Sequence, residues 1–147
     1  MLICCDTGIS IYLPLSTLVG VDLRELRLHR ARLLDTDLRG ACLVGTDLRG
    51  AILSRSLLEN VDARDAQLMT AQLVDADLRN ANLQGAWLNS VILEGANLEG
   101  ADLRGAHLTH ARWARAKLCR AKLLRRDLVK IDLSAVDGAA SIQWCDS

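Results

Sequence analysis

The chain has 147 residues, half of them apolar, and its 18 basic side chains balance its 18 acidic ones. This length provides one domain with room for a core. The balanced charge excludes the strong single-sign field by which most nucleic-acid and membrane-surface binders act. With three Trp, one Tyr and no Phe, the core must consist mainly of Leu and Ala, which favours a narrow, repetitive interior over a globular one.

Residues 1–15 are an apolar start that we interpret as an N-terminal cap. They begin with Met1-Leu2-Ile3-Cys4-Cys5, which lacks the basic region and the long apolar run of a secretory signal. No stretch of the chain approaches the roughly 20 apolar residues of a membrane-spanning helix. The five Cys are odd in number and irregular in spacing, which argues against a disulfide framework and a metal site. We therefore expect a cytoplasmic protein without membrane contact.

Residues 16–135 are a tandem five-residue repeat without insertion or deletion. The third residue of each block is Leu from Leu18 to Leu133, except at Ala63 and Trp113, and the first is usually small or β-branched. Within a block, these two residues alternate about an outward second residue, as in a strand. Gly, Asn and Asp gather at the fifth place, where the chain must bend. The pattern predicts short strands joined by corners, with every Leu pointing inward.

Charges indicate how many blocks make one coil. Coils of stacked β-structure lie about 4.8 Å apart, so directly stacked charges should be opposite in sign. Within residues 16–135, an offset of four blocks (twenty positions) gives eight opposite pairs and no like pair, whereas offsets of three and five blocks each give at least six like pairs. We therefore predict four blocks per coil, with an alternating charge ladder of Arg39, Glu59, Arg79 and Glu99 along one side.

Blocks such as Ala76-Asp77-Leu78-Arg79-Asn80 and Ala101-Asp102-Leu103-Arg104-Gly105 resemble the repeats of the pentapeptide-repeat proteins. The resemblance covers about 120 of the 147 residues. It implies an all-β fold, a right-handed quadrilateral β-helix, here of about six coils with four blocks in each. The right hand rests on the resemblance alone. A purely structural or regulatory role in a bacterium rich in such repeats is compatible with this resemblance.

The chain continues beyond the repeat as residues 136–147, which we interpret as a C-terminal cap or tail. Arg126 occupies an inward position that a closed apolar core does not hold cheaply, so regular coiling should end near it. Ile142 and Trp144 are apolar enough to cover the last coil. Alternatively, an uncovered end or an apolar side pairs with a second copy of the chain, which makes a homodimer.

Three histidines raise the question of chemistry. His29 and His107 share a side but lie four coils apart, about 19 Å at the sheet spacing. His107 and His110 are close, but no Cys, Asp or Glu column completes a metal set. Stacking builds no Ser-His-Asp or Cys-His arrangement, and the glycines recur as corners rather than as a phosphate loop. We expect no catalytic residue, no metal and no cofactor, and hence no enzyme.

One outer side and its neighbour carry apolar residues. The pattern is an apolar centre within a charged rim, between Arg32 and Arg112, which is typical of a protein interface. The alternative is scattered surface hydrophobes, which are common. The candidate interface consists of Leu34, Ile52, Met69, Val74, Trp87 and Ile92.

Charges are also sorted along the chain. Between Leu57 and Gly105, acidic residues outnumber basic ones eight to three, whereas residues 112–130 carry eight basic residues and one acidic residue. This basic end could meet an acidic protein or nucleic acid, but it lacks the interleaved exposed aromatic residues of single-strand binders, so nucleic acid is the less favoured partner. The candidate residues are Arg112, Arg115, Lys117, Arg120, Lys122, Arg125 and Lys130.

These observations favour a non-enzymatic interaction or scaffold module that presents flat faces to a protein partner of unknown identity. The family resemblance implies an alternative, a DNA mimic that modulates a type II topoisomerase such as gyrase. That mechanism needs a broadly acidic rod. Here Asp22, Asp62, Asp77 and Asp102 are each followed two places later by Arg, which should weaken the acidic field.

Overall fold

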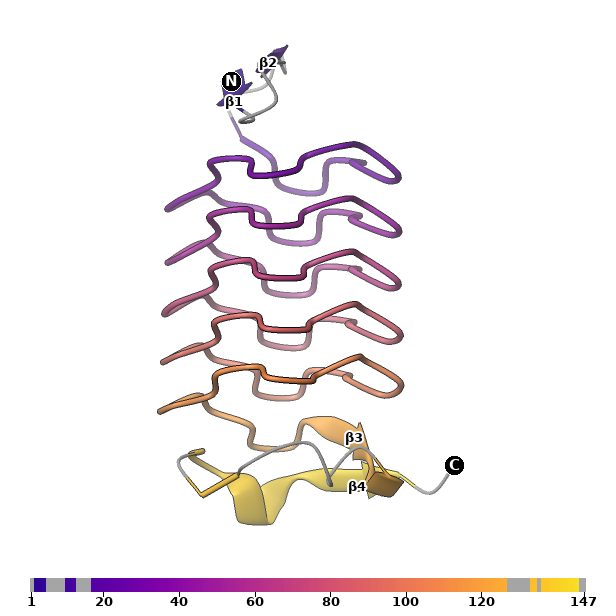
Figure 1. Cartoon of the computed structure of the whole chain (residues 1–147), viewed down its shortest axis with the longest axis vertical. Coiled ribbons are helices and arrows are strands. Elements are labelled where there is room, and N and C mark those ends of the chain that lie inside the picture. The colour runs from indigo at the N-terminus through magenta and orange to yellow at the C-terminus, as the bar shows by residue number, and fades with distance from the viewer. Residues whose placement is uncertain (1, 5–9, 13–16, 127–132, 135, 146–147) are drawn as a thin grey trace.

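The computed structural model describes residues 2–4, 10–12, 17–126, 133–134 and 136–145. Between residues 17 and 121, one turn recurs in every block, and single residues pair in parallel with their counterparts four blocks later, from Asp22 with Cys42 to Asp102 with Lys122. Four turns between paired residues make a four-sided coil, and the coils stack into a rod (Figure 1). The predicted stacking period is therefore confirmed, while the total of about six coils stays a prediction.

Regular strands occur only near the two ends of the described chain. β1 (Leu2–Cys4) pairs antiparallel with β2 (Ser10–Tyr12) at the N-terminal end, and β3 (Lys122–Leu124) pairs in parallel with β4 (Gln143–Cys145) at the other (Figure 1). Between them, each side of a coil contributes one bridging residue instead of the short strand that the sequence predicts. The turn follows the bridge too closely for a longer strand to form.

The backbone hydrogen bonds explain why the coils stack directly. The third residue of a block donates its N–H to the second residue of the next coil, as Leu43 does to the Asp62 carbonyl (2.7 Å). The second residue donates to the first residue of the preceding coil, as Asp62 does to the Ala41 carbonyl (3.0 Å). The turn is closed when the first residue of a block donates back to the third residue of the block before, as Thr46 does to the Leu43 carbonyl (3.1 Å). Each coil thereby satisfies the backbone of its neighbours.

The corners all use the same backbone conformation. Every fifth-place residue from Gly20 to Arg120 has a positive φ, including thirteen that are not glycine. Gly, Asn and Asp are expected there, but Thr70 at φ 59° is β-branched and strained in this region. At Gly95 a side chain would also overlap the Asp75 carboxylate of the preceding coil, so glycine there avoids both the backbone strain and a displacement of the Asp75 side chain.

The core is a column of leucines with small residues between them. All third-place leucines from Leu18 to Leu123 are buried, as is Trp113. Two buried hydroxyl groups occupy first-place positions and are satisfied by carbonyls of the preceding coil. Thr46 Oγ1 donates to the Leu23 carbonyl at 2.8 Å, and Ser56 Oγ donates to the Leu33 carbonyl at 2.5 Å. Small polar residues are therefore tolerated at the first place because they have an acceptor within reach.

The coil pattern changes at the C-terminal end. Lys117 still pairs with Asp137 at the regular spacing of four blocks, but Lys122 pairs with Gln143, one position beyond that spacing. The extra residue lies in the 3-10 helix η2 (Ala139–Ser141), which separates the two pairings. Regular coiling does end near Arg126, whose side chain is exposed.

The tail packs on the last coil of the core. Ile142 is buried within the core cluster, and Trp144 is partly buried against it, which is the packing expected of a cap. The prediction that residues 1–15 form an N-terminal cap depends on side chains that lie outside the described part of the chain. The proposed division at residues 15 and 135 stays a prediction.

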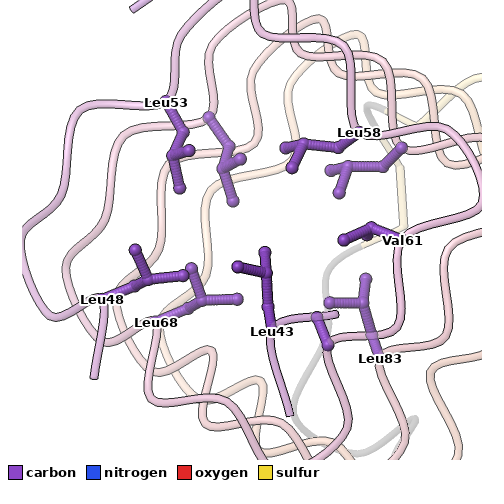
Figure 2. Close-up of a pocket in the computed structure, with 10 residues that line it drawn as sticks. Leu43, Leu48, Leu53, Leu58, Val61, Leu68 and Leu83 are labelled. Carbon is purple, nitrogen blue, oxygen red and sulfur yellow. The ribbon is translucent and has the colours of Figure 1, made fainter. Parts of the chain in front are cut away.

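A small cavity lies where Ala63 replaces the usual Leu. It is lined only by aliphatic side chains, including Leu43, Val61 and Leu83. The volume that the centre of a water-sized sphere can occupy is about 10 Å³. Figure 2 shows Leu43, Val61 and Leu83 pointing into this space. A single water needs about 10–15 Å³ and two to four polar partners, so the cavity is dry. Val61, in place of the more common Ala, fills part of the gap.

Val61→Ala should therefore be unusually costly, because it removes two methyl groups beside an existing cavity. We expect the free energy of unfolding, measured by urea denaturation, to fall by about 1–3 kcal/mol. Adding Ala63→Leu to that variant restores the regular repeat and should recover most of the loss. A Val61→Ala variant as stable as the parent chain would show that Val61 does not compensate for Ala63.

Candidate functional site

The four sides of the rod differ in the residues that they present. We name them by the outward second-place residues that stack on each side. Face A carries Thr17, Asp37, Leu57, Asp77, Asn97 and Lys117, and face B carries Asp22, Cys42, Asp62, Asn82, Asp102 and Lys122. Face C carries Arg27, Asp47, Gln67, Trp87 and His107, and face D carries Arg32, Ile52, Gln72, Ile92 and Arg112.

Faces A and B use their second-place residues to complete the backbone. The fourth residue of each block has no backbone acceptor for its N–H among the hydrogen bonds of the described coils. Asp, Asn or Thr at the second place accepts this N–H through its side-chain oxygen, as in Arg79 N to Asp77 Oδ1 (3.2 Å) and Glu99 N to Asn97 Oδ1 (3.1 Å). This is the local turn for which Asp and Asn are favoured. On face D, none of the five second-place residues is of this kind.

The same aspartates hold the arginines that follow them. Six Asp-x-Arg units form salt bridges of 2.6–2.7 Å within one block. Five lie on faces A and B, one lies on face C, and none lies on face D. The six units are Asp22–Arg24, Asp37–Arg39, Asp47–Arg49, Asp62–Arg64, Asp77–Arg79 and Asp102–Arg104.

These ion pairs shift the titration of the carboxyl groups. The hydrogen bond from the Arg24 guanidinium, with that from its backbone N–H, lowers the pKa of Asp22 to about 2. The Arg79 side chain likewise lowers the pKa of Asp77. For Asp102, burial acts in the opposite direction, but hydrogen bonds from Arg104 and Gln84 prevail and its pKa is lowered. The aspartates thus stay ionised and locally neutralised at physiological pH.

Ion pairs between coils are fewer than the predicted charge ladder suggests. Glu59 accepts from Arg79 at 3.4 Å across one coil step, and Asp35 pairs with Arg55 at 2.7 Å. Arg39, however, makes its salt bridge with Asp37 at 2.7 Å in its own block. The stacking in the predicted ladder is confirmed: Asp37 has the largest effect in raising the pKa of Arg39, and the charge of Glu59 adds to it. The direct salt bridge of Arg39 goes to Asp37, because that Asp lies in the same block.

The edge between faces C and D carries no charge over two coils. No charged side chain occurs in residues 66–74 or 86–93, although such residues make up a quarter of the chain. We call this region the neutral edge. Its outward residues are Gln67, Met69, Thr70, Gln72, Val74, Trp87, Asn89, Ser90 and Ile92.

Four of the six predicted interface residues lie on the neutral edge. Trp87 is 45% exposed, while Met69, Val74 and Ile92 are half-buried. Leu34, 43% exposed, and the half-buried Ile52 extend the apolar surface along face D. The structure separates Ile52 from Ile92 by Gln72, which bridges both, so the apolar surface is interrupted.

Some surface features escaped the sequence analysis. The Trp87 ring stacks on His107 with centroids 4.2 Å apart and an angle of 20° between the planes. The offset of four blocks on one face could have revealed this pair, since the stacking rule applies to all side chains. Leu57 and Val19, 40% and 45% exposed, lie on face A, at outward places of the repeat that the pattern also identifies.

The predicted basic residues lie around the C-terminal coil. Arg112, Arg115, Lys117, Arg120 and Arg125 are exposed and Lys122 is half-buried, whereas Lys130 lies outside the described residues. Arg112 donates to Glu94 at 2.5 Å. In the described part of the chain, no three His, Cys, Asp or Glu side chains are placed to hold a metal ion. None of its helical segments has the length and apolar character needed to cross a bilayer.

Comparison with known families gives one match, to the model described as pentapeptide repeats, over residues 16–55, 56–95 and 96–134. Comparison with curated protein sequences gives no match. A pentapeptide-repeat protein of the Arabidopsis thaliana thylakoid lumen is 26% identical, with 84% of each chain covered and a TM-score of 0.52.

Two further solved structures match with lower TM-scores. HetL, a pentapeptide-repeat protein involved in heterocyst differentiation regulation in Nostoc sp., is 33% identical over 71% of this chain, with a TM-score of 0.41. The chain spans about half the length of HetL, 52%. QnrB1, a plasmid-mediated fluoroquinolone resistance protein, is 14% identical, with 87% of this chain and 84% of QnrB1 covered and a TM-score of 0.40.

The lowered pKa values of the aspartates predict acid sensitivity. A carboxyl with a lower pKa in the folded than in the unfolded chain stabilises the fold above its unfolded value of about 3.9, and this stabilisation is lost as the pH falls through its folded pKa. We expect the free energy of unfolding, from urea titrations, to fall between about pH 5 and pH 2.

The variant Asp77→Asn/Asp102→Asn tests this origin. Asn keeps the acceptor for the fourth-place N–H, as Asn82 and Asn97 show, but it loses the ionic contact with Arg. The variant should lose a few tenths to about 1 kcal/mol per pair at neutral pH and show a shallower acid decline. An unchanged pH profile would assign the acid sensitivity to other groups.

Proposed function

The chain belongs to the pentapeptide-repeat family, and from that premise we propose that it is a non-enzymatic module that docks a protein partner on the neutral edge. The observation that carries the proposal is the difference between the outward residues of faces A and B and those of the neutral edge. On faces A and B, the outward Asp and Asn residues are explained by the fold, because they close the turns and hold Arg. The apolar residues of the neutral edge serve no such purpose.

The composition of the neutral edge suits a protein surface. Interface centres are depleted in charged residues and enriched in aromatic residues and Met, as Trp87 and Met69 illustrate. The rim is charged, with Asp47–Arg49 on face C and Glu94–Arg112 on face D. In protein complexes, binding energy concentrates in central aromatic residues that lose their contact with water on binding and are surrounded by such a rim.

The DNA-mimic alternative is less well supported. Five aspartates on faces A and B are each neutralised by an Arg of the same block, so the outward field of these faces is weaker than their acid content suggests. We expect purified chain to leave the supercoiling activity of DNA gyrase unchanged in a gel-based assay. Concentration-dependent inhibition, or protection from a gyrase poison, would support the alternative.

The docking surface is tested with Ile52→Asp/Ile92→Asp. Each new Asp stacks between an Arg and Gln72, so the fold should tolerate it and thermal melting should change little. Affinity capture from the native lysate with the parent chain as bait should recover a specific protein, and the double variant should lose it. Light scattering on the same samples shows whether the partner is a second copy.

The matched control is Val44→Asp/Asn97→Asp, which adds the same charge on faces B and A. Val44 lies four blocks from both Arg24 and Arg64, and Asn97 stacks between Asp77 and Lys117. This control should capture the partner as well as the parent chain does. Equal capture by all three proteins would remove the neutral edge from consideration as the docking surface.

A further inference from the structure

Basic residues lie on three sides of the C-terminal coil, at the ends of faces D, A and B, whereas the end of face C carries none. Residues 106–126 contain seven Arg or Lys and no Asp or Glu. Arg115 and Arg120 are one block apart and occupy successive corners. Arg125 and Arg126 follow strand β3, and the others lie on the faces beside the corners. We call the set Arg112, Arg115, Lys117, Arg120, Lys122, Arg125 and Arg126 the basic collar.

The collar differs from the rest of the chain in the way its cations are held. Elsewhere, six arginines are held by an Asp two places earlier. No collar residue has an acidic residue at that place. Arg112 pairs with Glu94. Within the described chain, the exposed Arg115, Lys117 and Arg120 have no carboxylate within 4.0 Å of their charged groups.

The shape of the collar limits what can bind it. Its cations lie on one coil and the start of the next, a band roughly 5–10 Å tall at the spacing of stacked coils. Residues 57–105 on its N-terminal side carry eight acidic and three basic side chains, and those three Arg are already held by Asp. A polyanion lying along the rod would be repelled by these acidic residues. The collar therefore suits a thin, extended chain that runs around the coil, perpendicular to the axis of the rod.

The surroundings favour carboxylates over nucleotides. Binding of single-stranded nucleic acid combines cations with aromatic platforms for the bases. Lys117 and Lys122 lie on faces A and B, with Arg120 at the corner between them, whereas the stacked Trp87 and His107 lie on face C. Trp113 points inward and is 5% exposed. The faces that carry these lysines therefore offer ionic contacts without a stacking surface.

We propose that the basic collar binds an extended acidic segment of a protein, at a site separate from the neutral edge. Carboxylates of such a segment would pair with Arg115, Lys117 and Arg120 along the end of face A. The guanidinium groups of Arg115 and Arg120 allow bidentate contacts with carboxylates. Because the contacts are exposed and ionic, the affinity should weaken as salt rises.

The test uses the full chain and two fluorescent probes with equal numbers of charges, a poly-glutamate peptide and a poly-thymidylate strand. Binding is followed by fluorescence anisotropy at low and moderate salt. The parent chain should bind the poly-glutamate peptide more tightly than it binds the poly-thymidylate strand. Arg115→Glu/Arg120→Glu should weaken peptide binding at least about tenfold. Glu is tolerated at such corners, as Glu25 at φ 58° shows.

The control is Arg30→Glu/Arg32→Glu, which changes the net charge equally at an exposed corner and an exposed face position near the N-terminal end. At moderate salt it should alter peptide affinity by no more than about twofold, since these charges lie about four coils, roughly 19 Å, from the collar, which is about two screening lengths. Thermal melting of both variants confirms that they fold. Equal losses in the two variants, no peptide binding, or tighter collar-dependent binding of the nucleic acid would each overturn the proposal.

Discussion

The structure depends on the backbone hydrogen bonds that join each block to its counterpart one coil away. These bonds force four equal sides, align the leucines into one column and place outward residues of like position on a common face. Local stability is then shared mainly between neighbouring coils, as in other solenoids. The consequences extend to charge, because each outward side chain within the stack has two predetermined neighbours.

One unsatisfied backbone group accounts for much of the surface chemistry. The fourth-place N–H lacks a backbone acceptor in the described coils, and Asp or Asn two places earlier supplies one. The carboxylate that does so also attracts the Arg that carries this N–H. Faces A and B therefore acquire self-neutralised ion pairs for structural reasons, whereas the neutral edge and the basic collar are surfaces whose composition the fold does not require.

The repeat itself allowed most of the fold to be predicted. Leu at the third place of each five-residue block indicates the inward side, and the signs of charges four blocks apart are consistent with only one number of blocks per coil. The salt bridge of Arg39 with Asp37 was not identified from the ladder, since spacing alone does not compare a contact within a block with one between coils. Likewise, the one-residue shift before Gln143 arises from η2 and has no counterpart in the five-residue pattern. The residues of the candidate surfaces followed from their positions in the repeat. The sequence also lacks charge in residues 66–74 and 86–93, but only the structure shows that these two stretches stack on one edge between faces C and D.

In a four-sided coil with one block per side, the number of blocks between two residues also determines whether they lie on the same face. Removing or inserting four whole blocks would change the length of the rod but keep each downstream residue on its face. A change of a single block would instead rotate everything beyond it by a quarter turn. Chains of this kind can therefore alter the distance between two binding surfaces independently of the direction in which each surface points.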